Sequence, residues 1–246
     1  MKIKNITASA AGVLLTASFA YAGEMAAPKA PVEFDTQEPF SLGAEVSVGY
    51  DSKYVFRGVD FGDNLIWADV NFAVPVTDTV EFTLGTWYAS LADTDYDELN
   101  VYTGLSADLG AVSVGVGLTY YYFPTGGSDI WEPGANIGTS VGPIDLSLGY
   151  YYDTDVSGSY LELAGESTIE ITDTIAIVPG ASISWADDYY GVSGFNNVGA
   201  SLALPISLTD TATLTPYVAA SWAIDKLSDT GEGDHYYGGV ALSVSF

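Results

Sequence analysis

The sequence predicts an all-β fold, a transmembrane antiparallel up-and-down β-barrel of about twelve strands with both termini in the periplasm. Three observations predict it. Apolar and polar residues alternate with period two from Leu42 to the end of the chain, which is the signature of strands. Very short connections alternate with longer ones between these runs. The first residues have the form of an export signal.

The N-terminus has the three parts of a Sec signal peptide. Lys2 and Lys4 are followed by an apolar run over residues 6–20, which ends in the A-x-A sequence of residues 20–22. The run is about 15 residues long, and a membrane anchor needs about 20. We therefore expect residues 1–22 to be a cleaved signal peptide, residues 23–40 a Pro-rich periplasmic leader, and residues 41–246 the barrel.

The alternation divides the barrel into runs that each have one aliphatic and aromatic face and one small, polar face. In the run 111–123, valines and tyrosines alternate with Ser, Gly and Thr. Apolar residues that face the lipid and small polar residues that face the lumen are typical of a β-barrel in a membrane. The predicted strands are 42–57, 64–76, 80–91, 98–109, 111–123, 132–141, 143–153, 159–171, 174–186, 195–208, 211–224 and 235–246.

The connections support this topology. Five are very short, and three of these have the sequence Thr-Asp-Thr, at residues 77–79, 172–174 and 209–211. The others are longer and acidic or Gly-rich. Short periplasmic turns and long outer loops are typical of outer-membrane barrels. The chain ends in an alternating run with a terminal Phe246, which resembles the assembly signal of bacterial outer-membrane proteins.

Composition and charge limit the possible functions. Charged residues make up 15% of the chain, against about 25% in soluble domains. The absence of Cys excludes a disulfide framework and a thiolate metal site, and we expect no cofactor. Loss of residues 1–22 leaves 4 of the 6 basic residues against 32 acidic ones, which excludes nucleic acid as a partner. The acidity has two explanations that stay open, cation selectivity and a saline habitat.

The chain's only Arg is Arg57. If the parity of Val46, Val48 and Tyr50 continues along the first strand, residues 54 and 56 face lipid and residues 53 and 57 face inward. We expect Arg57 to be drawn to carboxylates across the lumen, to pin the first strand or loop to the wall, and to narrow the outer mouth. A salt bridge without a role in transport is the alternative.

Acidic residues fall repeatedly on the inward parity. They would give the lumen a negative potential that favours cations, or be satisfied by hydroxyls and water with little effect on selectivity. Aromatic residues of the same parity would fill the interior or form a track for solutes: Trp67, Trp87, Tyr102, Tyr121 and Tyr217. The predicted lining and constriction residues are Arg57, Lys53, Glu45, Asp69, Glu81, Glu162, Glu166 and Glu170.

Ca²⁺ binding and lipid hydrolysis are two other functions that the sequence can be tested for. The acidic loops at residues 93–98 and 153–155 offer oxygen ligands of the kind that Ca²⁺ takes, but the first lacks the spacing of a Ca²⁺ loop. A lipid hydrolase of this fold would need a Ser within about 3 Å of a general base. The only His is His235, and the serines of its own strand, Ser243 and Ser245, are too far along that strand. We expect no enzymatic activity.

Residues 48–59, Val-Gly-Tyr-Asp-Ser-Lys-Tyr-Val-Phe-Arg-Gly-Val, resemble the opening motif of the TorF-type putative porins. In that family a strand ending in an aromatic residue, followed by Phe-Arg-Gly, starts the barrel after a signal peptide. The resemblance implies a porin-like role in the outer membrane and carries over only Arg57. The strong acidity and the Pro-rich leader are not features of that pattern.

These features lead to one expected function and two alternatives. The expected function is passive diffusion of small cations or small solutes through a narrow acidic lumen, with outer-membrane lipid as the other partner. The first alternative is a closed structural or adhesive barrel whose acidic outer loops bind a partner or Ca²⁺. The second is an outer-membrane lipid hydrolase. The sequence leaves the solute and the oligomeric state open.

Overall fold

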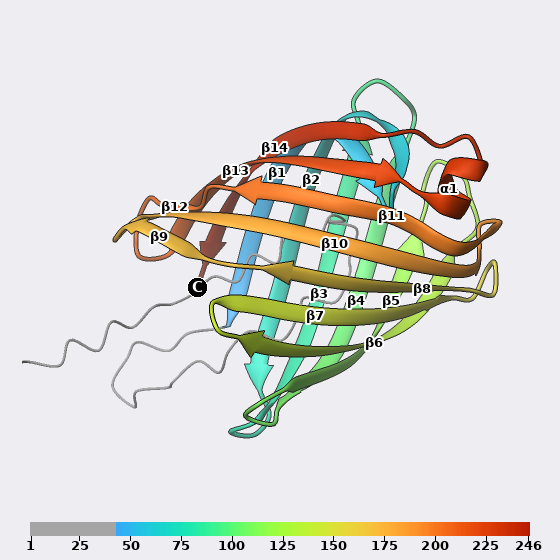
Figure 1. Cartoon of the computed structure of the whole chain (residues 1–246). Coiled ribbons are helices and arrows are strands. Elements are labelled where there is room, and N and C mark those ends of the chain that lie inside the picture. The colour runs from blue at the N-terminus through green and yellow to red at the C-terminus, as the bar shows by residue number, and fades with distance from the viewer. Residues whose placement is uncertain (1–42) are drawn as a thin grey trace, which may run out of the picture.

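The structure, a computed structural model, describes residues 43–246. The predicted signal peptide (1–22) and leader (23–40) lie outside the described residues. The wall of the molecule consists of antiparallel strands, which Figure 1 shows wrapped into one tilted barrel. The strands are β1 (Ala44–Phe56), β2 (Val59–Pro75), β3 (Val80–Leu91), β4 (Asp97–Asp108), β5 (Ser113–Tyr122), β6 (Ile130–Val141), β7 (Ile144–Asp153), β8 (Gly158–Glu166), β9 (Ile169–Thr172), β10 (Ile175–Tyr189), β11 (Val192–Ala203), β12 (Ile206–Ser207), β13 (Ala212–Ala223) and β14 (His235–Ser245).

The sheet closes because the last strand, β14, pairs with the first strand, β1, over Glu45↔Ser245 to Asp51↔Gly239. The short strands β9 and β12 continue β8 and β11 beyond a break, and they pair with β10 and β13. Pro205 lies in the second break and lacks the N–H that a continuous ladder needs. When each broken strand is counted once, the wall has the predicted twelve antiparallel strands, and the prediction of a closed antiparallel β-barrel is confirmed.

The two ends of the barrel differ. One end, which we call the turn end, carries the five short connections, and there the Phe246 N–H donates to the Ala44 carbonyl at 2.9 Å. The other end, which we call the loop end, carries four connections of 4 to 11 residues, two tight turns at residues 57–58 and 190–191, and the short helix α1 (Asp225–Asp229). The longer loop expected between the predicted strands 174–186 and 195–208 is thus a two-residue turn, because β10 and β11 extend to Tyr189 and Val192. In Figure 1 α1 and the C-terminus lie at opposite ends of the barrel. No helix within residues 43–246 is long and apolar enough to cross a membrane.

The outer face of the wall is apolar, as the alternation predicts. On β5, Val116 is 58% exposed and Tyr122 41% exposed, whereas Thr119 and Tyr121 on the opposite face are buried. The same division recurs around the barrel, and large apolar side chains remain exposed on nearly every strand. An unbroken apolar exterior of this kind is stable in hydrocarbon and unfavourable in water.

Large rings fill the interior because glycines on neighbouring strands leave room for them. A Cβ on Gly49 would lie 2.2 Å from the Trp67 indole, and one on Gly85 would lie 2.3 Å from the Tyr102 ring. The expected inward rings Trp67, Trp87 and Tyr121 are all buried. The loop half of the barrel is therefore packed with side chains.

Candidate lumen site around Arg57

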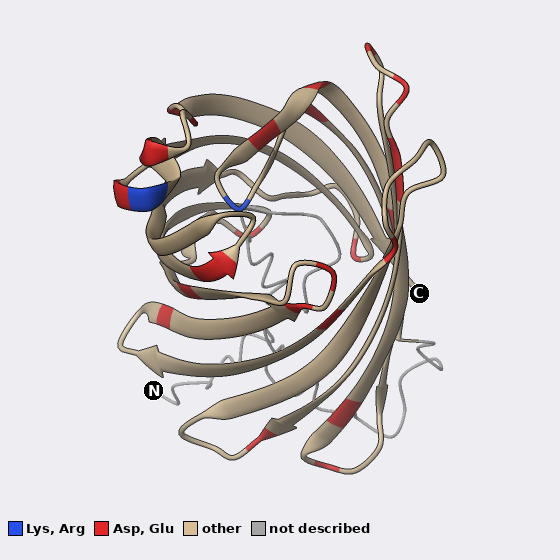
Figure 2. Cartoon of the chain, turned by 90° about the vertical axis from the view of Figure 1, so that its right-hand side faces the viewer, with Lys and Arg blue, Asp and Glu red and all other residues tan. Residues whose placement is uncertain are grey.

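The first two strands leave the wall near the loop end. β1 pairs with β14 only as far as Asp51, but its pairing with β2 continues to Phe56↔Val59. Residues 52–64 therefore form a two-stranded arm, which we call the inner hairpin. Figure 2 looks into this end of the barrel and shows a hairpin with a blue, basic tip inside the ring of strands. The inner hairpin thus carries its tip across the lumen.

The tip of the inner hairpin is a tight turn. Arg57 and Gly58 have φ values of 50° and 86°, both in the left-handed region. Two such residues in succession are typical of the two-residue turns whose twist matches that of the flanking strands. Gly58 also lies in close contact with Leu227 and Asn197, where a Cβ would approach to 2.7 and 3.0 Å.

The guanidinium of Arg57 binds a carboxylate on the far wall. It donates two hydrogen bonds to the two carboxylate oxygens of Glu132 on β6, at 2.7 and 2.8 Å, and a third to the Tyr189 hydroxyl at 2.8 Å. Asn196 donates to the Arg57 carbonyl at 2.7 Å. Both Arg57 and Glu132 are 4% exposed. Bidentate, charge-assisted bonds of this kind are the strongest that side chains make.

Four aromatic rings surround the same guanidinium. Its central carbon lies 4.7 Å from the ring centroids of Phe56 and Tyr151, 4.6 Å from Tyr160 and 5.2 Å from Tyr189. Only Phe56 belongs to the inner hairpin. The faces of such rings attract a desolvated cation, by about 2 kcal/mol in favourable cases. We call the three wall rings together with Glu132 the aromatic cage.

The structure contradicts the predicted parity at the end of β1. Tyr54 and Phe56 were expected to face lipid, but Tyr54 is 4% exposed and packs within 6.0 Å of the Trp87 ring, measured between centroids. Phe56 lies against Arg57 and Tyr121. The physical reason is the departure of the inner hairpin from the wall. Once a hairpin enters the lumen, both of its faces are inside, and alternation no longer separates lipid from lumen.

The other predicted lining residues lie at different depths. Asp69 is 8% exposed, and the Tyr102 hydroxyl donates its one hydrogen to the Asp69 carboxylate, whose two oxygens lie 2.9 and 3.1 Å away. Glu45 and Glu81 are half-buried towards the turn end. Glu162 and Glu166 are half-buried, whereas Glu170 on β9 is exposed. Arg57 lies in the aromatic cage, and Glu162 lies beside it, where it accepts a hydrogen bond from the Tyr160 hydroxyl at 3.4 Å and interacts with the charge of Arg57.

Several interior carboxylates accept hydrogen bonds from neutral groups. Asp51 accepts from the Trp67 indole at 3.0 Å and from the Tyr217 hydroxyl at 2.7 Å. Glu98, which is 2% exposed, accepts from Tyr54 and Tyr96 at 2.9 and 2.6 Å. Burial raises the pKa of Tyr96, in the loop before β4, so its phenol stays protonated and donates. Among the described residues no cation forms an ion pair with Asp51 or Glu98.

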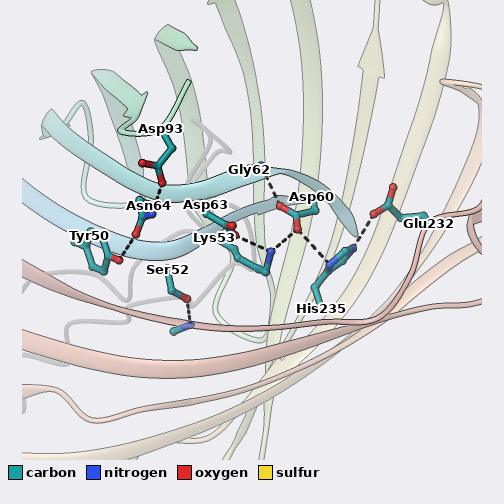
Figure 3. Close-up of polar contacts among 11 residues, drawn as sticks. Tyr50, Ser52, Lys53, Asp60, Gly62, Asp63, Asn64, Asp93, Glu232 and His235 are labelled. Atoms are coloured by element: carbon teal, nitrogen blue, oxygen red, sulfur yellow. Dashed lines mark hydrogen bonds and ion pairs between the residues drawn. The ribbon is translucent and has the colours of Figure 1, made fainter. Parts of the chain in front are cut away.

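A second polar cluster surrounds His235 where the inner hairpin meets β14. Figure 3 shows the imidazole between Asp60 and Glu232, at 3.5 and 2.7 Å, and Lys53 bonded to Asp60 and Asp63 at 2.7 Å each. Both ring nitrogens thus face carboxylates. Within the described residues no group of three or more His, Asp or Glu is arranged to hold a metal ion.

Sequence reasoning missed the partners of Arg57. Glu132 lies at the start of a predicted strand and was not considered as a lining residue, and Tyr151, Tyr160 and Tyr189 lie in three different strands. The only sequence evidence for these partners was the charge of the residues. A single Arg in a chain with 32 acidic residues must pair with some of them, and Glu132 follows Trp131, a residue typical of the lipid-facing row. The sequence could not show which carboxylate the inner hairpin reaches.

The comparisons with solved structures place this fold among outer-membrane barrels. The COG4313 outer membrane channel from Pseudomonas putida F1 aligns with a TM-score of 0.58 and 12% identity, over 87% of this chain and 100% of that chain. The KdgM porin aligns with a TM-score of 0.54 and 8% identity, over 82% and 99%. The NanC porin aligns with a TM-score of 0.50 and 12% identity, over 82% and 98%. At these identities the likeness establishes the fold.

The protein is therefore a bacterial outer-membrane-type β-barrel with an arginine-tipped hairpin folded into its lumen. A family model described as "Bacterial protein of unknown function (Gcw_chp)" matches residues 33–179, which is more than half of the chain, and the chain belongs to this family. No curated protein sequence matches it significantly. This family description does not confirm the TorF-type label of the sequence resemblance.

Proposed function

We propose that this protein is an outer-membrane channel for passive diffusion of small cations or small neutral solutes. One observation carries the proposal, the closed twelve-stranded wall around an interior with several buried carboxylates and one Arg, which is itself neutralised by Glu132. A negative interior attracts cations and repels anions. The channels and porins among the structural neighbours have the same fold, and the TorF-like opening motif points to the same class.

The charge of the interior argues against polyanions as solutes. One solved structure shows the KdgM porin with oligogalacturonate, a polyanion. The present chain has 6 basic against 32 acidic residues, and Lys53 is held by two carboxylates. An anionic oligosaccharide would have few cations to bind here. We therefore propose cations or uncharged solutes as the transported class.

We place the turn end in the periplasm and the loop end outside the cell, because short turns face the periplasm in barrels of this type. In that orientation the inner hairpin lies at the outer mouth. Arg57 and the aromatic cage then narrow the lumen where solutes enter. The exported form would lack the predicted signal peptide, and residues 23–40 would form a periplasmic leader.

A flux assay tests the proposal. Purified full-length protein is refolded into liposomes, and the uptake of choline, glucose and gluconate is compared with that of protein-free liposomes. We expect choline and glucose to enter faster than gluconate, because the lumen repels the anion. Uptake equal to that of protein-free liposomes, from protein shown to be folded, would favour the closed structural barrel instead.

A further inference from the structure

The aromatic cage and its occupant come from different parts of the molecule. Tyr151, Tyr160 and Tyr189 lie on the adjacent wall strands β7, β8 and β10, and Glu132 lies on β6. Arg57 reaches them on the inner hairpin. The pocket around the guanidinium is thus built by the wall and filled by the tip of a separate arm.

The interactions inside the cage specify a guanidinium group. The two carboxylate oxygens of Glu132 accept from two nitrogens of Arg57, which is the fork geometry of a planar guanidinium. The Tyr189 hydroxyl accepts from one of them as well. The Tyr160 and Tyr189 rings are themselves in contact, with centroids 5.8 Å apart. A point-charged ammonium could use the rings but not both carboxylate oxygens in this way.

The cage is also positioned independently of its occupant. Tyr121 donates to Glu132 at 3.1 Å from β5, and the Tyr160 hydroxyl lies 3.4 Å from both the Glu162 carboxylate and the Asn197 side-chain oxygen. Neither of these hydroxyl groups bonds to the guanidinium through the contacts named here. They therefore hold the cage in place without needing Arg57. A site whose lining is fixed by its own bonds keeps its shape when the occupant leaves.

We propose that the aromatic cage is a binding site for small solutes that carry a guanidinium group, and that Arg57 occupies it as a tethered stand-in. When the inner hairpin withdraws, a free guanidinium compound takes the place of the Arg57 side chain. The inference deepens the proposed channel function by naming a solute class, and rests on it only for the route by which solutes reach the cage.

The test is a binding measurement on the full-length, refolded protein in detergent, with methylguanidinium as the probe. The Arg57→Ala variant is expected to bind methylguanidinium in isothermal titration calorimetry more than about tenfold more tightly than the unsubstituted protein does, because in the unsubstituted protein the solute must displace Arg57 from the cage. The double variant Arg57→Ala/Glu132→Gln is expected to bind more than about tenfold more weakly, because it lacks the buried charge partner. Methylammonium is expected to bind Arg57→Ala more weakly than methylguanidinium does.

A matched control removes a cation elsewhere on the same hairpin. Lys53→Ala leaves Arg57 in the cage and is expected to bind methylguanidinium as weakly as the unsubstituted protein does. If Arg57→Ala refolds poorly, the refolding yield becomes the measurement. Methylguanidinium in the refolding buffer is expected to raise the yield of this variant above the yield that equal methylammonium gives.

Two results would overturn the proposal. One is folded Arg57→Ala that binds methylguanidinium no better than the unsubstituted protein does. The other is a refolding yield that methylguanidinium does not improve over methylammonium. Neither measurement needs a current or a flux. A protein that binds methylguanidinium but does not conduct would therefore support the binding site and contradict the channel function. A protein that conducts but does not bind methylguanidinium would contradict only the binding site.

Discussion

At the residue scale, the fold depends on how the chain buries its one arginine. Removing a charge from water costs several kcal/mol, and a buried pair recovers this only when its geometry is good and its remaining donors are bonded. Arg57 meets both conditions, with two bonds to Glu132, one to Tyr189 and rings around the guanidinium. The pair therefore holds the inner hairpin to the far wall.

Loss of one partner should be costly. We expect Glu132→Gln to lower the free energy of unfolding by about 3–5 kcal/mol, because Arg57 is left buried without its counter-charge. Urea unfolding in detergent measures the change. The control is Lys226→Ala, which breaks a surface pair with Asp229 and is expected to leave the unfolding midpoint unchanged. Equal midpoints for Glu132→Gln and the unsubstituted protein would show that the pair does not hold the hairpin.

The sequence predicted one residue of this pair, Arg57, and not the other, Glu132. The lone Arg57 could be placed in the interior and assigned an acidic partner from charge alone. Its partner could not be identified, because the partner is set by the length and bend of the inner hairpin, and both are tertiary properties. The same bend is the reason that Tyr54 and Phe56 were assigned to the wrong side.

At the element scale, the wall was predictable and the inner hairpin was not. Strands buried on one side and lipid-facing on the other leave a strict period-two pattern, and the predicted strand ranges follow the observed ones closely. The break before β12 adds no strand because Ile206 and Ser207 stay in line with β11 and pair with β13. A hairpin that enters the lumen has no lipid face, so its sequence contains no alternation that could mark its path.

The turn at the tip supports a test of the hairpin's fit. We expect Gly58→Ala to lower the free energy of unfolding by about 1–3 kcal/mol, because a Cβ there strains the left-handed backbone and meets Leu227 and Asn197. Gly231→Ala is the matched control. Its φ of 95° carries the same backbone strain, but nothing lies within 4 Å of its Cβ. Thermal unfolding of both variants measures the difference, and equal losses would show that the tip is not tightly packed.

At the scale of the whole molecule, the surplus of acids sets the electrostatic potential of the barrel. Charges at the surface are screened at high salt, with a Debye length of about 10 Å at 0.1 M and about 3 Å at 1 M. Carboxylates inside a narrow lumen act on ions at contact distance and are screened much less. Lumen and surface acids can therefore be distinguished by their effect on ion selectivity.

Neutralising one lumen carboxylate should reduce cation selectivity. We expect Asp69→Asn to shift the reversal potential in a KCl gradient towards zero, because Asp69 lies buried on the inner face of β2. Asp210→Asn, in an exposed Thr-Asp-Thr turn, is the control and should leave the potential unchanged in 1 M salt. Identical shifts in the two variants would assign the selectivity to the general acidity of the molecule, as in a saline habitat, rather than to the lumen.

The most direct test of the central claim is the single-channel current of refolded protein in a planar bilayer with unequal KCl on the two sides. We expect discrete current steps, a cation-selective reversal potential, and a larger conductance for Arg57→Ala, because that variant frees the inner hairpin from the far wall. Silent bilayers from both proteins, each shown to be folded, would contradict the claim that this barrel is a channel.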